Sequence, residues 1–225
     1  MKISEIYELF DKIGVLTFST IYNNEVHSRV AHFNGCDDEG IYFRTMWNKP
    51  FGRQLMETKK ITVCGLSDTR ILSHDGDLGA EFPPGYSIRL IGELRYMEEE
   101  EVREKAKTNE DLKLAVFDMD KYPAMKKGNF IIHKAKVEIY DYDFSCKNRD
   151  HKLLRKRVAF GGMTYNKVGP TITDKCIECG LCFKKCSFKA IETGTPYKVN
   201  TERCDDCGDC LTACPVNAIE LSSTF

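Results

Sequence analysis

The feature that most constrains this chain is a pair of cysteine motifs near its end. Eight of the eleven cysteines lie between positions 176 and 214. The first motif reads CIECGLCFKKCSFKAI and the second CDDCGDCLTACPVNAI, and each has the spacing C-x2-C-x2-C-x3-C. Three closely spaced thiolates on a tight loop suit one face of an iron–sulfur cubane, and the fourth cysteine then reaches a second cluster. The spacing therefore predicts two 4Fe-4S clusters.

The predicted ligand sets cross between the two motifs, because each fourth cysteine serves the other cluster. The expected sets are Cys176, Cys179, Cys182 and Cys214 for one cluster, and Cys204, Cys207, Cys210 and Cys186 for the other. Gly180 and Gly208 occupy matching places, where a cramped loop favours a residue without a side chain. Two structural zinc sites are the alternative, but such sites use separated C-x2-C pairs and give the third cysteine no role.

Residues 170–225, which contain both motifs, resemble the bacterial two-cluster ferredoxins. One departure is that Ser187 follows the last cysteine of the first motif, where the second motif has Pro215. Neither side chain is an expected iron ligand, so the change leaves the ligand sets intact. At most it alters the reduction potential of a cluster. The resemblance implies an electron carrier, which explains how electrons travel but not where they go.

Charge is distributed unevenly along the 225 residues. Residues 145–169 contain seven Lys or Arg and one Asp, although the whole chain has a formal net charge of −1. This basic connector does not by itself indicate a nucleic-acid partner, since most basic runs are simply solvated. Part of it is expected to pack, because apolar residues such as Leu154 and Phe160 interrupt the charges. The opening MKISEIYELFDKIG has no apolar signal region, and no stretch is long enough to span a bilayer, so a cytoplasmic protein is expected.

The first 144 residues are expected to form one antiparallel barrel domain. Ile3, Ile6, Phe10 and Ile13 share one face of a helix beginning near Ser4. GVLTFSTI and EVHSRVAHF flank Asn-Asn and predict a β-hairpin, and YSIRLIGELRYM alternates as a half-buried strand should. IYFRT, KITVCGL and NFIIHKAKVEIYDYDF are the other expected strands, and EEEEVREKAKT and EDLKLAVF are expected helices. The predicted class is mainly β (α+β), with domains 1–144 and 170–225 joined by the connector 145–169.

The run RVAHFNGCDDEGIYFRTMWNKPFGRQLMETKKITVCG resembles the FMN-binding split barrel of the pyridoxamine 5′-phosphate oxidase-like family. The similarity is strongest to its small nitroreductase-like branch and spans residues 1–144. It depends on the order and spacing of the RV strand, IYFRT, NK and RQL. The resemblance implies a homodimer with two FMN sites at the subunit interface.

An FMN phosphate requires fixed positive charge and neutral hydrogen-bond donors. Side chains that could supply them are Arg29, Arg44, Thr45, Asn48, Lys49 and Arg53. The resemblance implies that Lys49, Asn48 and Thr45 lie at the phosphate, and that Val30 and Ala31 offer backbone groups beside the isoalloxazine ring. It also implies flavin contacts for Gln54 and Ser87. Pro50 stands where many relatives carry a further basic residue, so phosphate binding would be distributed differently here.

No acid–base residue stands out, and the catalytic candidates are His32 and His74. His32 belongs to the strand expected to border the flavin, although a structural strand histidine is the more common case. His74 falls in a Gly- and Pro-containing loop, residues 67–86, that suits either a lid or an idle surface excursion. Cys36, Cys64 and Cys146 have no matched neighbours, and Trp47 is expected to pack in the core or at an interface rather than to stack on flavin.

The leading hypothesis is an anaerobe-type reductase. Electrons would pass from an external low-potential donor through two 4Fe-4S clusters to FMN and on to a small organic acceptor. The alternative is an electron-transfer or redox-sensing protein without a small-molecule substrate of its own. A third interpretation keeps the barrel but replaces FMN by another ligand such as haem.

Overall fold

The computed structural model describes residues 1–67, 73–75, 79–81, 85–141, 154–165 and 169–221. The chain divides into two compact units. The first unit comprises residues 1–67, 88–137 and 158–164, and the second comprises residues 68–87, 138–157 and 165–225. The second unit therefore groups the C-terminal cysteine domain with the ends of three long strands. In the described part of the chain, no helix combines the length and apolar character needed to cross a membrane.

The N-terminal elements form as the sequence predicts. Helix α1 (Ile3–Ile13) buries Ile6 and Phe10, which its apolar spacing places on one face. Strands β1 (Leu16–Tyr22) and β2 (Glu25–Ala31) pair antiparallel. The two asparagines between them have φ angles of 50° and 61°. Positive φ at both central residues is the conformation that a tight hairpin turn requires, and asparagine tolerates it well.

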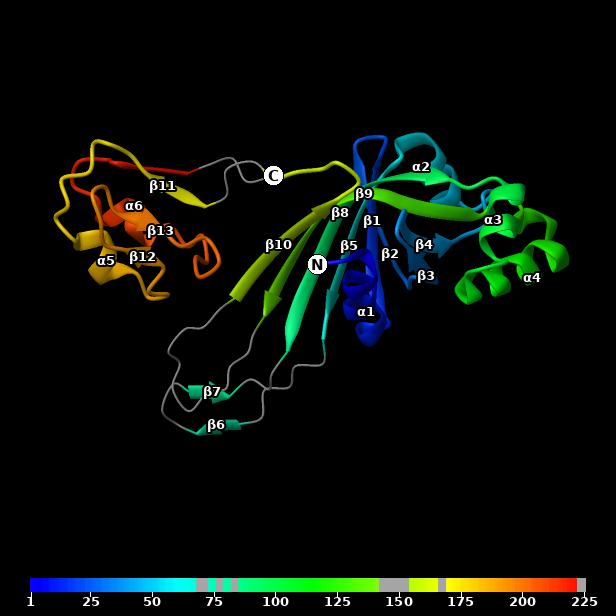
Figure 1. Cartoon of the computed structure of the whole chain (residues 1–225), viewed down its shortest axis with the longest axis horizontal. Coiled ribbons are helices and arrows are strands. Elements are labelled where there is room, and N and C mark those ends of the chain that lie inside the picture. The colour runs from blue at the N-terminus through cyan, green and yellow to red at the C-terminus, as the bar shows by residue number, and fades with distance from the viewer. Residues whose placement is uncertain (68–72, 76–78, 82–84, 142–153, 166–168, 222–225) are drawn as a thin grey trace. The chain divides into compact units, whose positions relative to one another are not determined.

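The main sheet has eight strands, seven of them in the order β2-β1-β5-β8-β9-β4-β3, with β10 (Leu154–Phe160) paired to β9 (Figure 1). Its further strands are β3 (Gly35–Asp37), β4 (Gly40–Arg44), β5 (Lys60–Leu66), β8 (Tyr86–Tyr96) and β9 (Asn129–Asp141). The helices are α2 (Pro50–Thr58), α3 (Glu99–Lys105), η1 (Glu110–Leu112), α4 (Lys113–Lys121) and η2 (Pro123–Met125). Every element expected in 1–144 is present, and the antiparallel, sheet-rich α+β class is confirmed.

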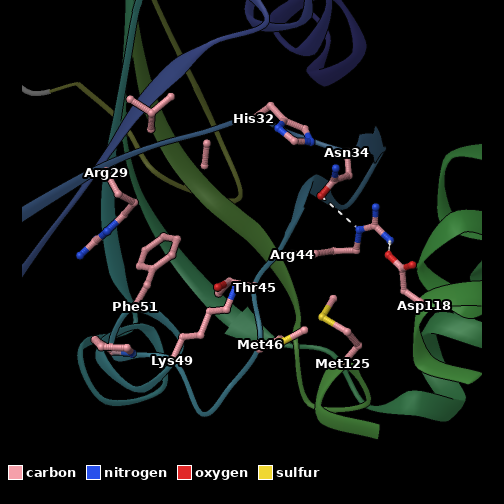
Figure 2. Close-up of a pocket in the computed structure, with 13 residues that line it drawn as sticks. Arg29, His32, Asn34, Arg44, Thr45, Met46, Lys49, Phe51, Asp118 and Met125 are labelled. Carbon is pink, nitrogen blue, oxygen red and sulfur yellow. Dashed lines mark hydrogen bonds and ion pairs between the residues drawn. The ribbon is translucent and has the colours of Figure 1, made fainter. Parts of the chain in front are cut away.

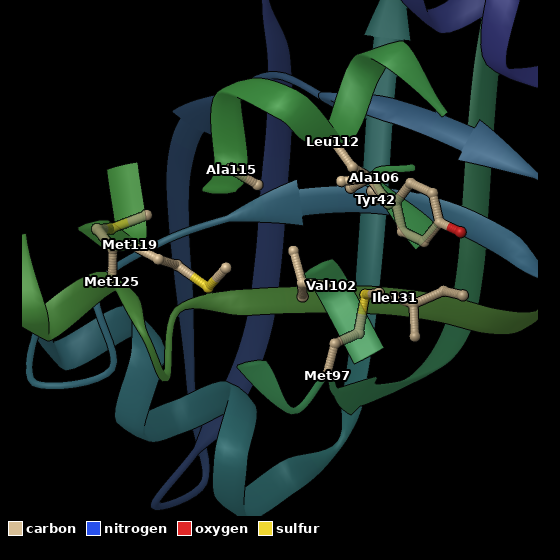
Figure 3. Packing of buried hydrophobic residues seen from close by; sticks show 9 residues of the cluster. All are labelled: Tyr42, Met97, Val102, Ala106, Leu112, Ala115, Met119, Met125 and Ile131. Atoms are coloured by element: carbon tan, nitrogen blue, oxygen red, sulfur yellow. The ribbon is translucent and has the colours of Figure 1, made fainter. Parts of the chain in front are cut away.

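Two packed groups form the core of the first unit. One is aromatic: the rings of Phe18 and Phe33 lie 5.1 Å apart, and those of Phe43 and Phe130 lie 5.5 Å apart in a stacked arrangement. The other group joins the helices α3 and α4 to the sheet, and Figure 3 shows its nine buried side chains, among them Tyr42 and Ile131. These groups hold β4 and β9 together, and β4 contributes Arg44 to the pocket described below.

Part of the basic connector is a strand. Residues Leu154–Phe160 form β10, which pairs with β9 and extends the main sheet. The expectation that its apolar residues pack is met, since Val158 and Phe160 are half-buried. The charges Arg155, Lys156 and Arg157 occupy the first half of the strand, and the apolar residues Val158, Ala159 and Phe160 complete it. Cys146 lies outside the described residues.

A short hairpin replaces part of the loop expected over 67–86. Strands β6 (Ser73–Asp75) and β7 (Gly79–Glu81) pair antiparallel, and His74 is opposite Ala80 in that register. The remainder of this segment lies mostly outside the described residues. Its predicted role as a lid stays a prediction.

The cysteine domain in the second unit is an internal repeat. The first motif is flanked by β11 (Pro170–Ile172) and β12 (Ile191–Glu192) around α5 (Leu181–Lys185). The second is flanked by β13 (Lys198–Val199) and β14 (Ile219–Leu221) around α6 (Asp209–Ala213). β11 pairs with β14, and β12 with β13, so the two repeats interlock. Interlocking is what brings the fourth cysteine of each motif toward the other.

Candidate functional site

The eight motif cysteines surround two small cavities. The first thiol cavity is bordered by Cys176, Cys179, Cys182 and Cys214. The second thiol cavity is bordered by Cys186, Cys204, Cys207 and Cys210. This is the same crossed grouping as the expected ligand sets. Short helices explain it, because α5 and α6 each end at the fourth cysteine and their neighbouring strands pair across the repeat.

The two motifs have the same backbone conformation. Gly180 and Gly208 adopt left-handed φ angles of 73° and 83°, and Glu178 and Asp206 adopt φ angles of 56° and 57°. These turns aim backbone N–H groups at sulfur: the N–H groups of Glu178 and Asp206 donate to Cys176 Sγ and Cys204 Sγ, each at 3.4 Å. The repeated geometry indicates one function for both motifs.

Further N–H groups reach the fourth cysteine of each motif. Ala190 donates to Cys186 Sγ at 3.3 Å, and Ala218 donates to Cys214 Sγ at 3.2 Å. Four thiols around an apolar cavity, with N–H donors directed at the sulfurs, fit a 4Fe-4S cluster well, since such hydrogen bonds stabilise thiolate ligands. Burial raises the pKa of the Cys204 thiol to about 11, so a metal must displace a proton to bind there.

The first unit contains a pocket of about 650 Å³ on the sheet beside β2, β4 and α2. Its volume lies within the range of small-molecule and cofactor sites. Figure 2 shows Arg29, Phe51 and Lys49 on one side of the pocket and the Arg44–Asp118 pair on the other. The lining residues are Arg29, Val30, Ala31, His32, Asn34, Arg44, Thr45, Met46, Lys49, Pro50, Phe51, Asp118 and Met125.

Arg29 is held in the pocket wall by neutral partners. Its Nη1 donates to Thr20 Oγ1 at 3.1 Å and its Nη2 to Gln54 Oε1 at 2.7 Å. The guanidinium also lies 4.1 Å from the centre of the Phe51 ring. Burial lowers the pKa of Arg29, although a guanidinium stays charged at any physiological pH. Neutral partners leave that charge available for an anion.

Arg44 has a different environment. Its Nη1 lies 2.6 Å from Asp118 Oδ2, and its Nε donates to Asn34 Oδ1 at 3.3 Å. The carboxylate neutralises the guanidinium, so Arg44 contributes less positive charge to the pocket than its place in the motif had indicated. Asp118 comes from α4, far along the sequence, which no local pattern could reveal.

Lys49 is placed by the start of helix α2. It is the residue immediately before the helix, and Pro50 opens the first turn at the pocket. A helix N-terminus favours an anion because its first N–H groups have no partner within the helix. Gly52 allows this approach: a Cβ there would overlap the Met46 carbonyl oxygen and the Trp47 backbone. The glycine therefore keeps α2 close to the loop that carries Thr45 and Met46.

The pocket includes six of the ten expected flavin contacts, namely Arg29, Val30, Ala31, Arg44, Thr45 and Lys49. The other four, Asn48, Arg53, Gln54 and Ser87, are not among its lining residues. Asn48 and Arg53 are exposed, and Gln54 is buried behind the wall, where it fixes Arg29. Of the catalytic candidates, His32 borders the pocket, whereas His74 lies in β6 and does not.

Sequence reasoning missed several lining residues. Asn34, Met46 and Phe51 lie within the run that carries the resemblance to the split-barrel family. Their position in that run could have identified them as pocket residues. Asp118 and Met125 come from α4 and η2, well beyond the end of the motif run in the sequence, and only the packing of these helices on β4 and β9 brings them in. Trp47 is 44% exposed, so it does not belong to the core of this chain, and its packing at an interface stays a prediction.

Residues 175–218 match the family model of the 4Fe-4S dicluster domain. This match confirms the resemblance to two-cluster ferredoxins and supports iron–sulfur clusters as the cofactors of the C-terminal domain. The chain thus carries an iron–sulfur domain of the electron-transfer type. Comparison with curated protein sequences finds no match.

Solved structures resemble the chain over most of its length. A NimC/NimA family protein from Clostridium acetobutylicum is 14% identical, with 70% of this chain and 92% of that chain covered and a TM-score of 0.49. PhzG from Burkholderia lata 383, in complex with tetrahydrophenazine-1-carboxylic acid, is 17% identical, with 70% and 78% covered and a TM-score of 0.41. The FAD and haem binding protein from Mycobacterium smegmatis is 12% identical, with 73% and 83% covered and a TM-score of 0.48. These likenesses concern the fold only.

Proposed function

We propose that the chain is an iron–sulfur flavoprotein reductase. Electrons from an external low-potential donor would pass through two 4Fe-4S clusters to FMN in the pocket of the first unit, and then to a small organic acceptor. The observation that carries the proposal is the presence, in one chain, of two four-thiol cavities and a cationic pocket of cofactor size. Bound FMN would supply the conversion between one-electron and two-electron transfer.

The pocket residues fit a flavin mononucleotide. Lys49, Arg29 and the start of α2 offer positive charge for its phosphate, and the hydroxyl of Thr45 offers a neutral donor. Val30, Ala31 and Met46 provide an apolar surface for the ring system. His32 stands at the edge of this surface, where it can contact an acceptor. The Arg44–Asp118 ion pair makes the side of the pocket opposite Lys49 polar.

The identity of the cofactor is tested by purifying the full chain anaerobically, denaturing it and identifying the released chromophore by mass spectrometry. The proposal expects FMN, about one per chain, together with iron and acid-labile sulfide. Haem in place of flavin would overturn the FMN assignment. A chain that holds flavin but reduces no acceptor in a screen of nitro, quinone and azo compounds would be an electron-transfer or sensing protein instead.

We also propose that the chain forms a homodimer through the outer face of β1 and β2. Ile21, Val26 and Val30 are 65%, 72% and 69% exposed. They share one face, because Ile21 is opposite Val26 in the strand register and Val30 follows four residues later. Exposed apolar side chains clustered in this way mark an interaction surface. Val30 also lines the pocket, so a second copy on this face would approach the proposed flavin.

Val26→Asp is expected to shift the protein from dimer to monomer, because a charge buried in an apolar interface is costly. Light scattering after size-exclusion chromatography measures the mass directly. Leu114→Asp is the control: it places the same charge on an exposed leucine of α4, 56% exposed, and should leave the dimer intact. A monomeric wild type, or a Val26→Asp dimer of unchanged stability, would contradict this interface.

A further inference from the structure

The two cysteine motifs share their backbone but differ in the two residues after the first cysteine. The first motif has Ile177 and Glu178, both exposed, whereas the second has Asp205 and Asp206, both half-buried. The Asp206 Oδ1 atom lies 3.6 Å from Cys204 Sγ, an expected ligand at the second thiol cavity. A carboxylate so close to a ligand sulfur places negative charge beside that cluster and not beside the other.

Two arginines of β10 compensate this charge. Arg157 donates from Nε to Glu138 at 2.9 Å, from Nη1 to the Thr201 carbonyl at 3.1 Å and from Nη2 to Asp206 Oδ2 at 3.4 Å. Arg155 forms an ion pair with Asp206 through Nη1, and its Nη2 lies 3.5 Å from Asp205 Oδ1. The two side chains are only 9% and 13% exposed. Solvent and salt therefore screen these charges weakly.

Further contacts join the loop of the second motif to strands β9 and β10. The backbone N–H of Arg155 donates to the Glu202 carbonyl at 2.8 Å. Tyr140 of β9 donates its hydroxyl to Asp205, and the Arg155 guanidinium lies 4.9 Å from the centre of the Tyr140 ring. All of these residues belong to the second compact unit. The loop of the second motif is thus bound to the ends of β9 and β10 by charged and aromatic contacts.

We propose that Arg155 and Arg157 are positioning residues that raise the reduction potential of the cluster in the second thiol cavity. The potential of an iron–sulfur cluster depends on nearby net charge, on hydrogen bonds to sulfur and on exposure. Reduction adds a negative charge, so neutralising the Asp206 carboxylate makes it more favourable. The first motif has no equivalent arginine pair in the part of the chain that the structure describes, so the two clusters are inequivalent. This inference rests on the cluster-binding part of the proposed function.

The test is a redox titration of the full-length, anaerobically purified protein, followed by electron paramagnetic resonance of the reduced clusters. Arg157→Gln and Arg155→Gln should each shift one of the two potentials to a more negative value. Asp206→Asn should shift the same potential in the opposite direction. Opposite signs are the decisive feature, because damage to the fold would not produce them.

Two matched variants complete the design. Lys156→Gln removes a positive charge from the exposed position between the two arginines and should leave both potentials unchanged. Glu178→Gln, at the equivalent but exposed place in the first motif, should leave the potential of the cluster in the second thiol cavity unchanged. Iron content is measured for every variant, so that loss of a cluster is not mistaken for a shift.

Potentials that do not move at full iron content, that move together, or that move in the same direction for Arg157→Gln and Asp206→Asn would overturn the inference. Loss of half the iron in the arginine variants would also overturn it, since the arginines would then be needed to hold the cluster rather than to tune it. A wild-type chain that takes up no iron would instead refute the proposed function itself, and this outcome is distinguishable from the others.

Discussion

Replacing both Cys214 and Cys176 by alanine should cost the chain about four of its roughly eight irons, because both thiols border the first thiol cavity. Replacing Cys214 and Cys204 should remove nearly all of the iron, because these cysteines border different cavities. The prediction follows from the interlocked strands, which bring the last cysteine of one motif to the first three of the other. Iron and sulfide analysis of reconstituted protein measures it.

Only the comparison of the two double variants distinguishes crossed from uncrossed ligand sets. Loss of any one ligand would damage one cluster whether the ligand sets cross or not, whereas the two double variants give reversed results for uncrossed sets. Cys64→Ala is the control, since this half-buried thiol lies in β5 and borders neither thiol cavity. Retention of half the iron by the Cys214 and Cys204 pair, with total loss in the Cys214 and Cys176 pair, would contradict the crossed arrangement.

Lys49→Gln is expected to weaken FMN binding by roughly ten- to a hundredfold, since a charge-assisted hydrogen bond contributes about 1.5–3 kcal/mol. Glutamine keeps most of the side-chain length and removes the charge. The loss of FMN affinity therefore measures the interaction of the Lys49 charge with the phosphate. Isothermal titration of the flavin-free protein with FMN gives the affinity. Riboflavin, which lacks the phosphate, should bind the wild type and the variant almost equally.

Lys60→Gln supplies the comparison for this change. Lys60 is an exposed lysine at the start of β5 and is not among the residues that line the pocket. The substitution should leave FMN affinity unchanged. Equal affinities for wild type and Lys49→Gln, or a comparable loss for riboflavin, would show that Lys49 does not serve the phosphate.

The cysteine domain could be anticipated from the sequence almost completely. Its geometry is local: left-handed turns at Gly180 and Gly208, short helices and fixed spacings determine where each thiol lies. The strands of the first domain were also predictable, because alternation such as that of β8 reflects burial on one face of a sheet. Both inferences depend on residues close together in the chain.

The parts that were not anticipated depend on distant contacts. Arg44 looked like a phosphate ligand in its motif, but α4 brings Asp118 to within 2.6 Å of it. Gln54 looked like a flavin contact, yet it is buried behind the pocket wall and orients Arg29. The apolar residues of the connector indicated that part of it packs, but no pattern indicated that Arg155 and Arg157 are largely buried against the acidic loop of the second motif. Spacing in sequence carries no signal for such partners.

We propose that the iron–sulfur domain and the pocket form one electron-transfer system. The most direct test is an anaerobic stopped-flow experiment in which the purified protein is mixed with a low-potential donor and followed at cluster and flavin wavelengths. We expect cluster bleaching to precede reduction of FMN, and Lys49→Gln protein stripped of flavin to show the first phase alone. Clusters that become reduced while bound flavin stays oxidised would contradict it.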